Sequence, residues 1–292
     1  MVSGPSRDKT ADACEVTESA WTPQSGSAWG SAQAEHEGSK NRLARLTQTL
    51  HSEVIPRLVV AHGKAANSPH RLQPRDIETF VALLRQGSDA EVGAAVASAH
   101  RGGMSVEAIF LELFATAAQH LGRLWESDEI DFSTCTICLG RLQRLLREWS
   151  PAFGQEVEHP PNGRRILLAQ HSDEQHIFGL SMVAEFFRRD GWEVLGGVGG
   201  AVPDPSRQVS RDWFDAVGFS IGSEMRLDWL TERIAQVRAT SRNRSVIVLV
   251  GGPLFTLNPE LAQQVGADAS GHAGASAPAL AEGLLGARLQ RR

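Results

Sequence analysis

The sequence predicts a bundle of four or five helices followed by an α/β domain with a doubly wound parallel sheet. Two observations carry this prediction. Between residues 41 and 150, apolar residues recur at the three- and four-residue spacing of amphipathic helices. From residue 164 onward, short continuous apolar runs alternate with amphipathic stretches, which is the pattern of parallel strands covered by helices on both faces.

The composition indicates a globular protein that works outside membranes. The chain has 292 residues, 41% of them hydrophobic, which is enough for two modest cores. No apolar run approaches the roughly 18 to 20 residues that span a bilayer, and the N-terminus lacks the features of a signal peptide, so we expect a cytoplasmic protein. The net charge of −5 gives no reason to expect direct DNA binding, because the phosphate backbone attracts basic surfaces.

The three cysteines predict free thiols. They are Cys14, Cys135 and Cys138, which are too few for a disulfide scaffold. Cys135 and Cys138 have the CxxC spacing of redox and half-zinc sites, but they lie within an amphipathic helical stretch and no second pair accompanies them. We expect both to be small core residues or residues that face a cofactor.

The first half of the chain divides into a polar tail and successive helices. Residues 1–40 are rich in Ser, Gly, Ala and acids without an apolar period, and they predict a disordered tail. Residues 41–150 predict the helical bundle, with Pro56 expected to kink its first helix. Capping-box spacing at Ser88 and Glu91 predicts the start of another helix. Further helices are predicted over residues 73–87, 104–125 and 131–149.

The second half predicts four strands. Residues 151–163 carry prolines and glycines between periodic segments and predict a linker. The α/β domain follows over residues 164–292. Apolar runs predict strands within residues 165–170, 192–198, 212–222 and 245–252, and amphipathic stretches predict helices over residues 181–191 and 226–240.

Three segments that follow predicted strands form the candidate site. They are "DEQHIFG" (173–179), "SIGS" (220–223) and "GGP" (251–253). Parallel sheets bind ligands beyond the carboxyl ends of their strands, so the three segments are expected at one rim. A histidine at the end of a strand is more often a turn residue than a metal ligand. The interpretation of His176 therefore depends on which residues surround it and at what spacing.

The first segment resembles the cobalamin-binding motif of flavodoxin-like (Rossmann-type) domains, which reads Asp, any, His, any, any, Gly. Here the motif stands as Glu174, Gln175, His176, Ile177, Phe178 and Gly179. The resemblance implies that His176 is the lower axial cobalt ligand and that Glu174, in place of Asp, orients its ring. It also implies that Gly179 lets the helix start approach the corrin.

By the same resemblance, the nucleotide tail of the cofactor threads into the sheet. The hydroxyl of Ser220 is then expected near the benzimidazole, with Gly222 and Ser223 beside it in the same segment. Gly251 and Gly252 are expected to leave room for the tail. The order Ser, Ile, Gly departs here from the Ser, any, Leu form that is common elsewhere.

The helical part resembles the bundle that covers the upper corrin face in corrinoid proteins. In the light-sensing repressors of that superfamily, a tryptophan is followed ten and eleven residues later by Glu-His, which help to shield an adenosyl group. Counting from Trp125 gives Cys135 and Thr136 instead. We therefore expect a hydroxo- or aquocobalamin rather than adenosylcobalamin, with His120 as a candidate upper ligand. Trp125 is either corrin-facing or a core residue.

These features combine in the PpaA/AerR family of photosynthetic bacteria, which the chain resembles from about Leu43 to Ala287. The resemblance is carried by "EVIPRLVVAHG", "DFSTCTICLGRLQRLLRE", "DEQHIFGL", "VLVGGPLF" and "VGADA". It implies a cobalamin-binding antirepressor that contacts a PpsR/CrtJ-type transcription repressor of photosynthesis genes, with light acting on the cobalt axial bond. Members have no helix-turn-helix, in agreement with a chain that lacks a basic recognition helix.

Two alternatives stay open. A corrinoid methyl carrier is an enzyme component of the same fold in which cobalt shuttles a methyl group. The chain shows no separate substrate domain, which favours a regulator without catalysis. A receiver-like module without a cofactor needs clustered acids at strand ends, and "RILLAQHSDEQH" supplies them only loosely.

Overall fold

The structure is a computed structural model that describes residues 72–157, 159–171, 177–197, 202, 204–271 and 273–290. By its internal contacts the chain divides into two units, residues 1–67 and residues 68–292, and every described residue belongs to the second unit. The expected tail and the expected first helix with Pro56 lie outside the described residues.

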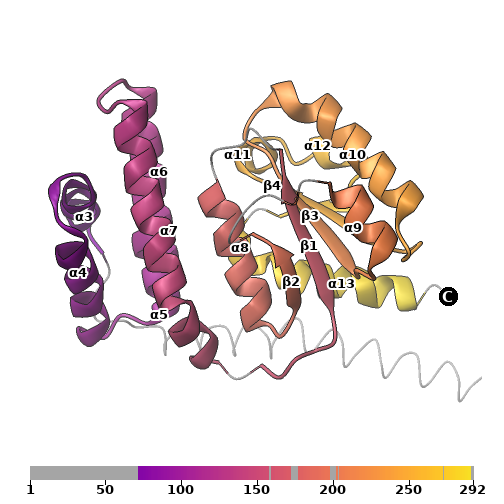
Figure 1. Cartoon of the computed structure of the whole chain (residues 1–292), viewed down its shortest axis with the longest axis horizontal. Coiled ribbons are helices and arrows are strands. Elements are labelled where there is room, and N and C mark those ends of the chain that lie inside the picture. The colour runs from indigo at the N-terminus through magenta and orange to yellow at the C-terminus, as the bar shows by residue number, and fades with distance from the viewer. Residues whose placement is uncertain are drawn as a thin grey trace, which may run out of the picture. The chain divides into compact units, whose positions relative to one another are not determined.

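Four helical rods make up the described part of the bundle (Figure 1). The first two are α3 (Pro74–Gln86) and α4 (Asp89–Arg101), and α4 begins with the predicted capping box of Ser88 and Glu91. The third rod is continuous through α5 (Val106–Ala108), η2 (Ile109–Phe114) and α6 (Ala115–Glu126), and the fourth is α7 (Phe132–Gln155). No helix in the described ranges has the length and hydropathy needed to cross a membrane.

Two features of these rods differ from expectation. The segment η2 is a π-helical turn, a local widening that the apolar spacing did not reveal. The helix α7 continues through Pro151, so the predicted linker of residues 151–163 begins inside a helix. A proline removes one helical hydrogen bond. The last turn nevertheless stays helical because Phe153 is fully buried against the rings of Phe110 and Phe186.

Five parallel strands form one sheet in the described part of the chain, in the order β2-β1-β3-β4-β5. This arrangement confirms the predicted fold class. The strand β1 spans residues 165–170 as predicted, and the strands are Arg165–Gln170, Glu193–Gly196, Ala216–Ser220, Ile247–Gly251 and Ala269–Ser270 for β1 to β5. The order reverses between β1 and β3, the switch point at which doubly wound sheets bind ligands.

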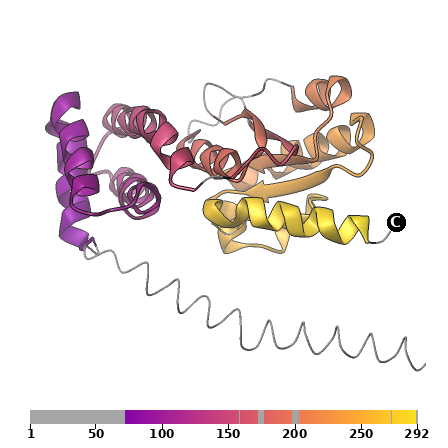
Figure 2. The same ribbon diagram turned by 90° about the horizontal axis from the view of Figure 1, so that it is seen from below.

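Helices cover both faces of the sheet (Figures 1 and 2). On one face, α8 (Ile177–Arg189) and α13 (Ala277–Leu289) pack in a core with Ile166 and Leu168 of β1. On the other face, α9 (Pro205–Arg211) and α10 (Leu227–Thr240) pack in a core with Leu167 and Ala169. Alternate residues of β1 therefore enter two cores, which explains its continuous apolar sequence. Shorter helices are η3 (Glu224–Arg226), α11 (Pro253–Leu257), α12 (Leu261–Gln264) and η4 (Gly274–Ser276).

The helix α8 belongs to two cores. One side packs on the sheet, while a stripe of residues at four-residue spacing is buried in the core of the helical bundle. This stripe consists of Phe178, Met182 and Phe186. Polar pairs run beside it: Gln143 donates to the Ser181 hydroxyl (3.0 Å), Ser150 donates to Glu185, and Arg189 pairs with Glu107 (2.8 Å). The bundle and the sheet therefore share one helix.

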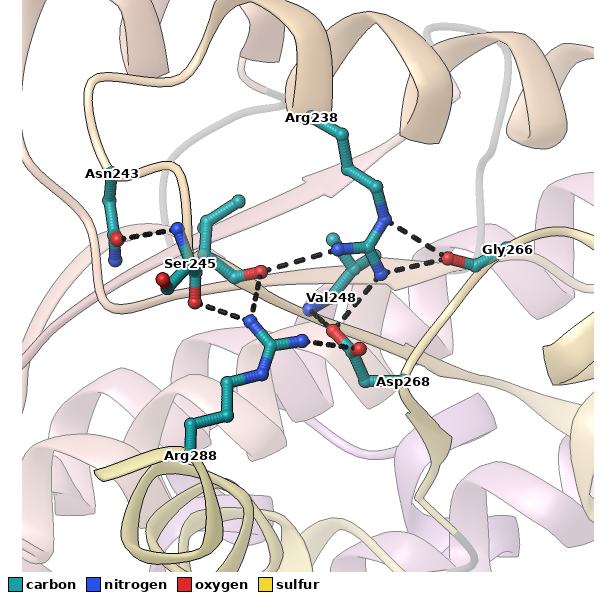
Figure 3. A network of polar contacts seen from close by, with 8 residues as sticks. Arg238, Asn243, Ser245, Val248, Gly266, Asp268 and Arg288 are labelled. Atoms are coloured by element: carbon teal, nitrogen blue, oxygen red, sulfur yellow. Dashed lines mark hydrogen bonds and ion pairs between the residues drawn. The ribbon is translucent and has the colours of Figure 1, made fainter. Parts of the chain in front are cut away.

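Asp268 joins three elements at the amino ends of β4 and β5 (Figure 3). Its Oδ2 accepts hydrogen bonds from the Val248 backbone (2.7 Å) and from Arg238 of α10 (3.0 Å), and its Oδ1 pairs with Arg288 of α13. Arg288 also donates to the Val246 carbonyl (3.0 Å). This network lies at the edge of the sheet opposite to the strand ends that carry the candidate site.

Candidate functional site

A large cavity opens at the carboxyl ends of the strands. It measures about 1030 Å³ and runs from α6 and α7 of the bundle, past α8, into the core between the sheet, α8 and α13. Residues of β1, β3 and β4 and the segments that follow β3, β4 and β5 complete its walls. Pockets for small-molecule ligands measure roughly 300 to 1,000 Å³, so this one is at the upper end of the range.

Most of the described site predictions meet at this cavity. Its lining includes Trp125, Cys135, Gly179, Ser220, Gly222, Gly251 and Gly252. Thr136 instead lines a neighbouring pocket of about 150 Å³, which shares Trp125 and Cys135 with the cavity. Ser223 lines neither space, and its side chain accepts a hydrogen bond from the Met225 backbone at the start of η3.

The motif histidine directly precedes the described start of α8. Glu174, Gln175 and His176 lie outside the described residues. The helix begins at Ile177, earlier than the predicted residue 181, and Ile177 lines the small pocket while Gly179 lines the cavity. Residues that line the cavity or the small pocket therefore begin directly after His176 in the sequence.

The glycines of the site differ in whether the protein's own backbone requires glycine there. A Cβ atom added at Gly179 would meet nothing within 4 Å, and one at Gly251 would meet the Gly271 carbonyl oxygen at 3.9 Å. Packing within the described protein does not require either glycine, so the space beside them is free for a ligand. Gly252 has a φ of 106°, and a Cβ atom there would lie 2.3 Å from the Ile221 carbonyl oxygen. Its backbone requires glycine with or without a ligand.

The sequence-based prediction missed the segment that follows β5. Gly271, Ala273, Gly274 and Ala277 line the cavity, as does Gly218 within β3. Glycine and alanine at these positions leave space between the sheet, α8 and α13. The run "SGHAGASA" (270–277) carries this signal, but the same composition is also typical of a turn.

The bundle side of the cavity is formed by α6 and α7. Ala115, Ala118 and Gly122 of α6 line it at helical spacing. Trp125 is 38% exposed and lies edge-on to Phe132, with ring centroids 6.5 Å apart. Trp125 is therefore a residue of the cavity wall and does not belong to the buried core of the bundle.

The two described cysteines are buried free thiols of α7. Burial raises the pKa of the Cys135 and Cys138 thiols above their ordinary range. Cys138 donates to the Leu84 carbonyl (3.5 Å), whereas Cys135 lines the cavity. A raised pKa disfavours the thiolate, which is the form that binds metals and attacks electrophiles. Within the described ranges, no cluster of three or more His, Cys, Asp or Glu could hold a metal ion.

His120 is not among the residues that line the cavity. It lies on α6, and its Nδ1 is 3.3 Å from Nη2 of Arg123. Arg123, one turn further along, is the residue that lines the cavity. The structure therefore does not bring His120 together with the other predicted site residues.

Residues 164–281 match the protein-family model described as "B12 binding domain". The chain contains a B12-binding domain. The matched range begins at the residue before β1, ends within α13 and includes every strand of the sheet. The cavity at the strand ends therefore lies largely in the B12-binding domain, and α6 and α7 of the bundle line it on one side.

Two further comparisons each cover more than half of the chain. The "Uncharacterized 20.5 kDa protein in bchF-crtJ intergenic region" of Rhodobacter capsulatus is 29% identical over 163 residues, 56% of this chain and 84% of that protein. This match and the B12-binding domain support the resemblance to the PpaA/AerR family. The monomethylamine corrinoid protein of Methanosarcina barkeri matches with a TM-score of 0.60 and 13% identity, over 72% of this chain and 98% of that chain, which shows a shared fold.

Proposed function

We propose that this protein is a cobalamin-binding antirepressor, a transcriptional regulator without catalytic activity. The observation that carries the proposal is the cavity, which continues from the strand ends into the core beside the sheet. Such a space suits a ligand with a broad head at the rim and a tail between the sheet, α8 and α13. The family match over the same strands supports cobalamin as that ligand.

The residues present fit a corrinoid. Gly179 and Gly251 leave free space at the rim, where a flat macrocycle has to approach the backbone closely. We assign His176 as the residue that would ligate the cobalt and Glu174 as the acid that would orient its ring. His176 directly precedes Ile177, the first residue of α8, and Glu174 stands two residues before His176. When bound, cobalamin supplies a cobalt axial bond that light or ligand exchange alters. The helices α6 and α7 of the bundle supply the remaining wall.

We further propose that the hydroxo or aquo form is bound in preference to adenosylcobalamin. Cys135 and Thr136 stand where adenosyl-binding relatives carry Glu-His, so the pair that helps to shield an adenosyl group is missing here. The proposal predicts a lower Kd for hydroxocobalamin than for adenosylcobalamin in dark titrations of the cofactor-free protein. A lower Kd for adenosylcobalamin would overturn it.

The regulatory part of the proposal draws on the relative and on charge. The Rhodobacter capsulatus protein is named for the bchF-crtJ intergenic region. We propose that the partner is a PpsR/CrtJ-type repressor of photosynthesis genes and that light is the signal. The net charge of −5 favours action through that protein over direct contact with DNA.

The cofactor assignment is tested by visible spectra of the full chain titrated with hydroxocobalamin. The wild-type protein is expected to take up cobalamin with a shifted spectrum, and His176→Ala is expected to lose the shift. His171→Ala is the matched control, because His171 contacts Arg226 and Trp229 and does not line the cavity. Failure of the wild-type protein to bind would overturn the cofactor, and an unchanged spectrum of His176→Ala would overturn the axial role.

The partner is tested by co-purification with a PpsR/CrtJ-type repressor. A complex whose amount depends on cobalamin or on illumination is expected, together with release of the repressor from its operator. Absence of a complex with and without cofactor, in the dark and in light, would overturn the antirepressor role.

A corrinoid methyl carrier is the second candidate. The structure with a TM-score of 0.60 is named a monomethylamine corrinoid protein, and it shares this fold. A carrier would transfer the methyl group of bound methylcobalamin to a thiol much faster than free methylcobalamin does. That result would replace the regulatory proposal, whereas a rate equal to that of the free cofactor supports it.

A further inference from the structure

We infer that the inner end of the cavity selects corrinoids by their lower base, accepting an apolar benzimidazole and disfavouring a purine. The inference rests on the proposed function, because it requires the nucleotide tail to occupy the space between the sheet, α8 and α13. It adds a preference among lower bases, which does not follow from cobalamin binding alone.

The inner end is apolar on every described side. The cavity enters the core in which α8 and α13 pack on the sheet, and the side chains that line it there are buried. They are Ile166, Leu168, Leu180, Phe187, Leu249 and Ala277. None of these side chains carries a hydrogen-bond donor or acceptor.

Polar groups of the cavity lie at its outer parts. Ser220 ends β3 at the rim, and the hydroxyl of Thr256 is bonded to the Gly252 carbonyl (3.2 Å). Backbone groups at the rim are also paired, as in the hydrogen bond from the Gly271 amide to the Val250 carbonyl (2.9 Å). The indole N–H of Trp192 is buried in the same core without a partner, but Trp192 does not line the cavity.

This distribution of apolar and polar groups is expected to favour a benzimidazole over a purine as the lower base. Dimethylbenzimidazole presents C–H and methyl groups to the inner walls and buries a single free ring nitrogen. Adenine adds an exocyclic amine and further ring nitrogens, which would lose their water without gaining partners. Burying such unpartnered groups is expected to weaken binding about tenfold to hundredfold.

The test compares the affinity of the full chain for three corrinoids: hydroxocobalamin, its adeninyl counterpart, and cobinamide, which lacks the nucleotide tail. Hydroxocobalamin is expected to bind about tenfold to hundredfold more tightly than the adeninyl form. Equal affinity for these two would overturn the inference. Equal affinity for cobalamin and cobinamide would also overturn it while leaving cofactor binding intact. Absence of binding by all three would overturn the proposed function itself.

A pair of alanine variants tests the wall directly. Ala277→Ser places a hydroxyl at the inner end and is expected to reduce the preference for cobalamin over the adeninyl form severalfold. Ala281→Ser is the matched control, because Ala281 lies one turn later on α13 in the same core but does not line the cavity. Its preference should equal that of the wild-type protein. An equal change of the preference in both variants, or none in either, would count against selection by the wall.

Discussion

Gly251 and Gly252 are neighbours in the chain and line the same cavity. Only one of them has a backbone conformation and surroundings that require glycine. Gly252 combines a φ of 106° with a close approach to the Ile221 carbonyl. Gly251 has open space where a side chain would stand. The motif "GGP" does not separate these roles, because backbone conformation is not visible in the letters.

Alanine at the two positions should therefore affect different properties: stability at Gly252 and cobalamin binding at Gly251. Gly252→Ala is expected to lower the free energy of unfolding of the cofactor-free protein by about 1 to 3 kcal/mol, through backbone strain. Gly251→Ala is expected to leave that free energy almost unchanged and to weaken cobalamin binding. Urea unfolding and corrinoid titration measure the two quantities. Equal losses of stability in the two variants would contradict this account.

Asp131 makes the start of α7 sensitive to pH. The backbone amide of Thr134 donates to Asp131 Oδ1 (2.7 Å), and this hydrogen bond holds the pKa of Asp131 below its ordinary value of 3.8. A carboxyl whose pKa is depressed by folding stabilises the folded protein above its ordinary pKa, and this stabilisation is lost as the pH falls through the folded value.

Asp131→Asn keeps an acceptor oxygen at the cap but does not titrate. The difference in unfolding free energy between the wild-type protein and Asp131→Asn is therefore expected to be constant near neutral pH. It should shift against the wild-type protein as the pH falls below about 3.8. Urea unfolding across this range measures the difference, and a difference that does not depend on pH would contradict the capping role.

At the scale of the element, the local sequence pattern predicted strands whose residues are buried along their whole length. It did not predict elements whose conformation depends on contacts with another segment. The strand β1 was predictable because nearly all of its residues are apolar. By contrast, β5 has two residues and takes its conformation from pairing with β4, where Ala269 faces Leu249. The early start of α8 and the late end of α7 follow from Phe178 and Phe153, which complete a core built by other segments. Such contacts are not encoded in local periodicity.

The network around Asp268 is expected to hold α10, α13 and the strands together. Asp268→Ala removes the partner of Arg238 and Arg288 and should lower the free energy of unfolding by about 2 to 3 kcal/mol. Glu193→Ala is the control, since its pairing with Arg165 is at the surface and contributes little. Cobalamin affinity should stay unchanged in both variants, because the network lies away from the cavity. Thermal unfolding with equal losses in the two variants would contradict this role.

At the scale of the whole molecule, the described bundle and the B12-binding domain are expected to unfold cooperatively, because they share the helix α8. The sequence predicted two domains joined by a linker, and the family match covers the second of them alone. The shared helix α8 places three residues of the B12-binding domain in the core of the bundle. Sequence pattern did not reveal this sharing, because an amphipathic helix does not identify which neighbour covers each side.

Phe186→Ala tests this cooperativity. Loss of a buried phenylalanine is expected to lower the free energy of unfolding by about 3 to 5 kcal/mol and to destabilise the bundle and the sheet together. Far-ultraviolet circular dichroism and tryptophan fluorescence should then report coincident transitions. Leu289→Ala, at a position that is 64% exposed, is the control and should change little. Two separate transitions, of which only one moves, would contradict a shared core.

The stripe of Phe178, Met182 and Phe186 also bears on how such proteins exchange parts. A chimaera cut at the linker would join this bundle to a foreign α8, whose three core residues were selected against a different set of helices. A cut after Arg189 would keep these contacts but would separate β1 and α8 from the remaining strands, with which they share a core. A chimaera that preserves both cores therefore has to carry the bundle and the α/β domain together.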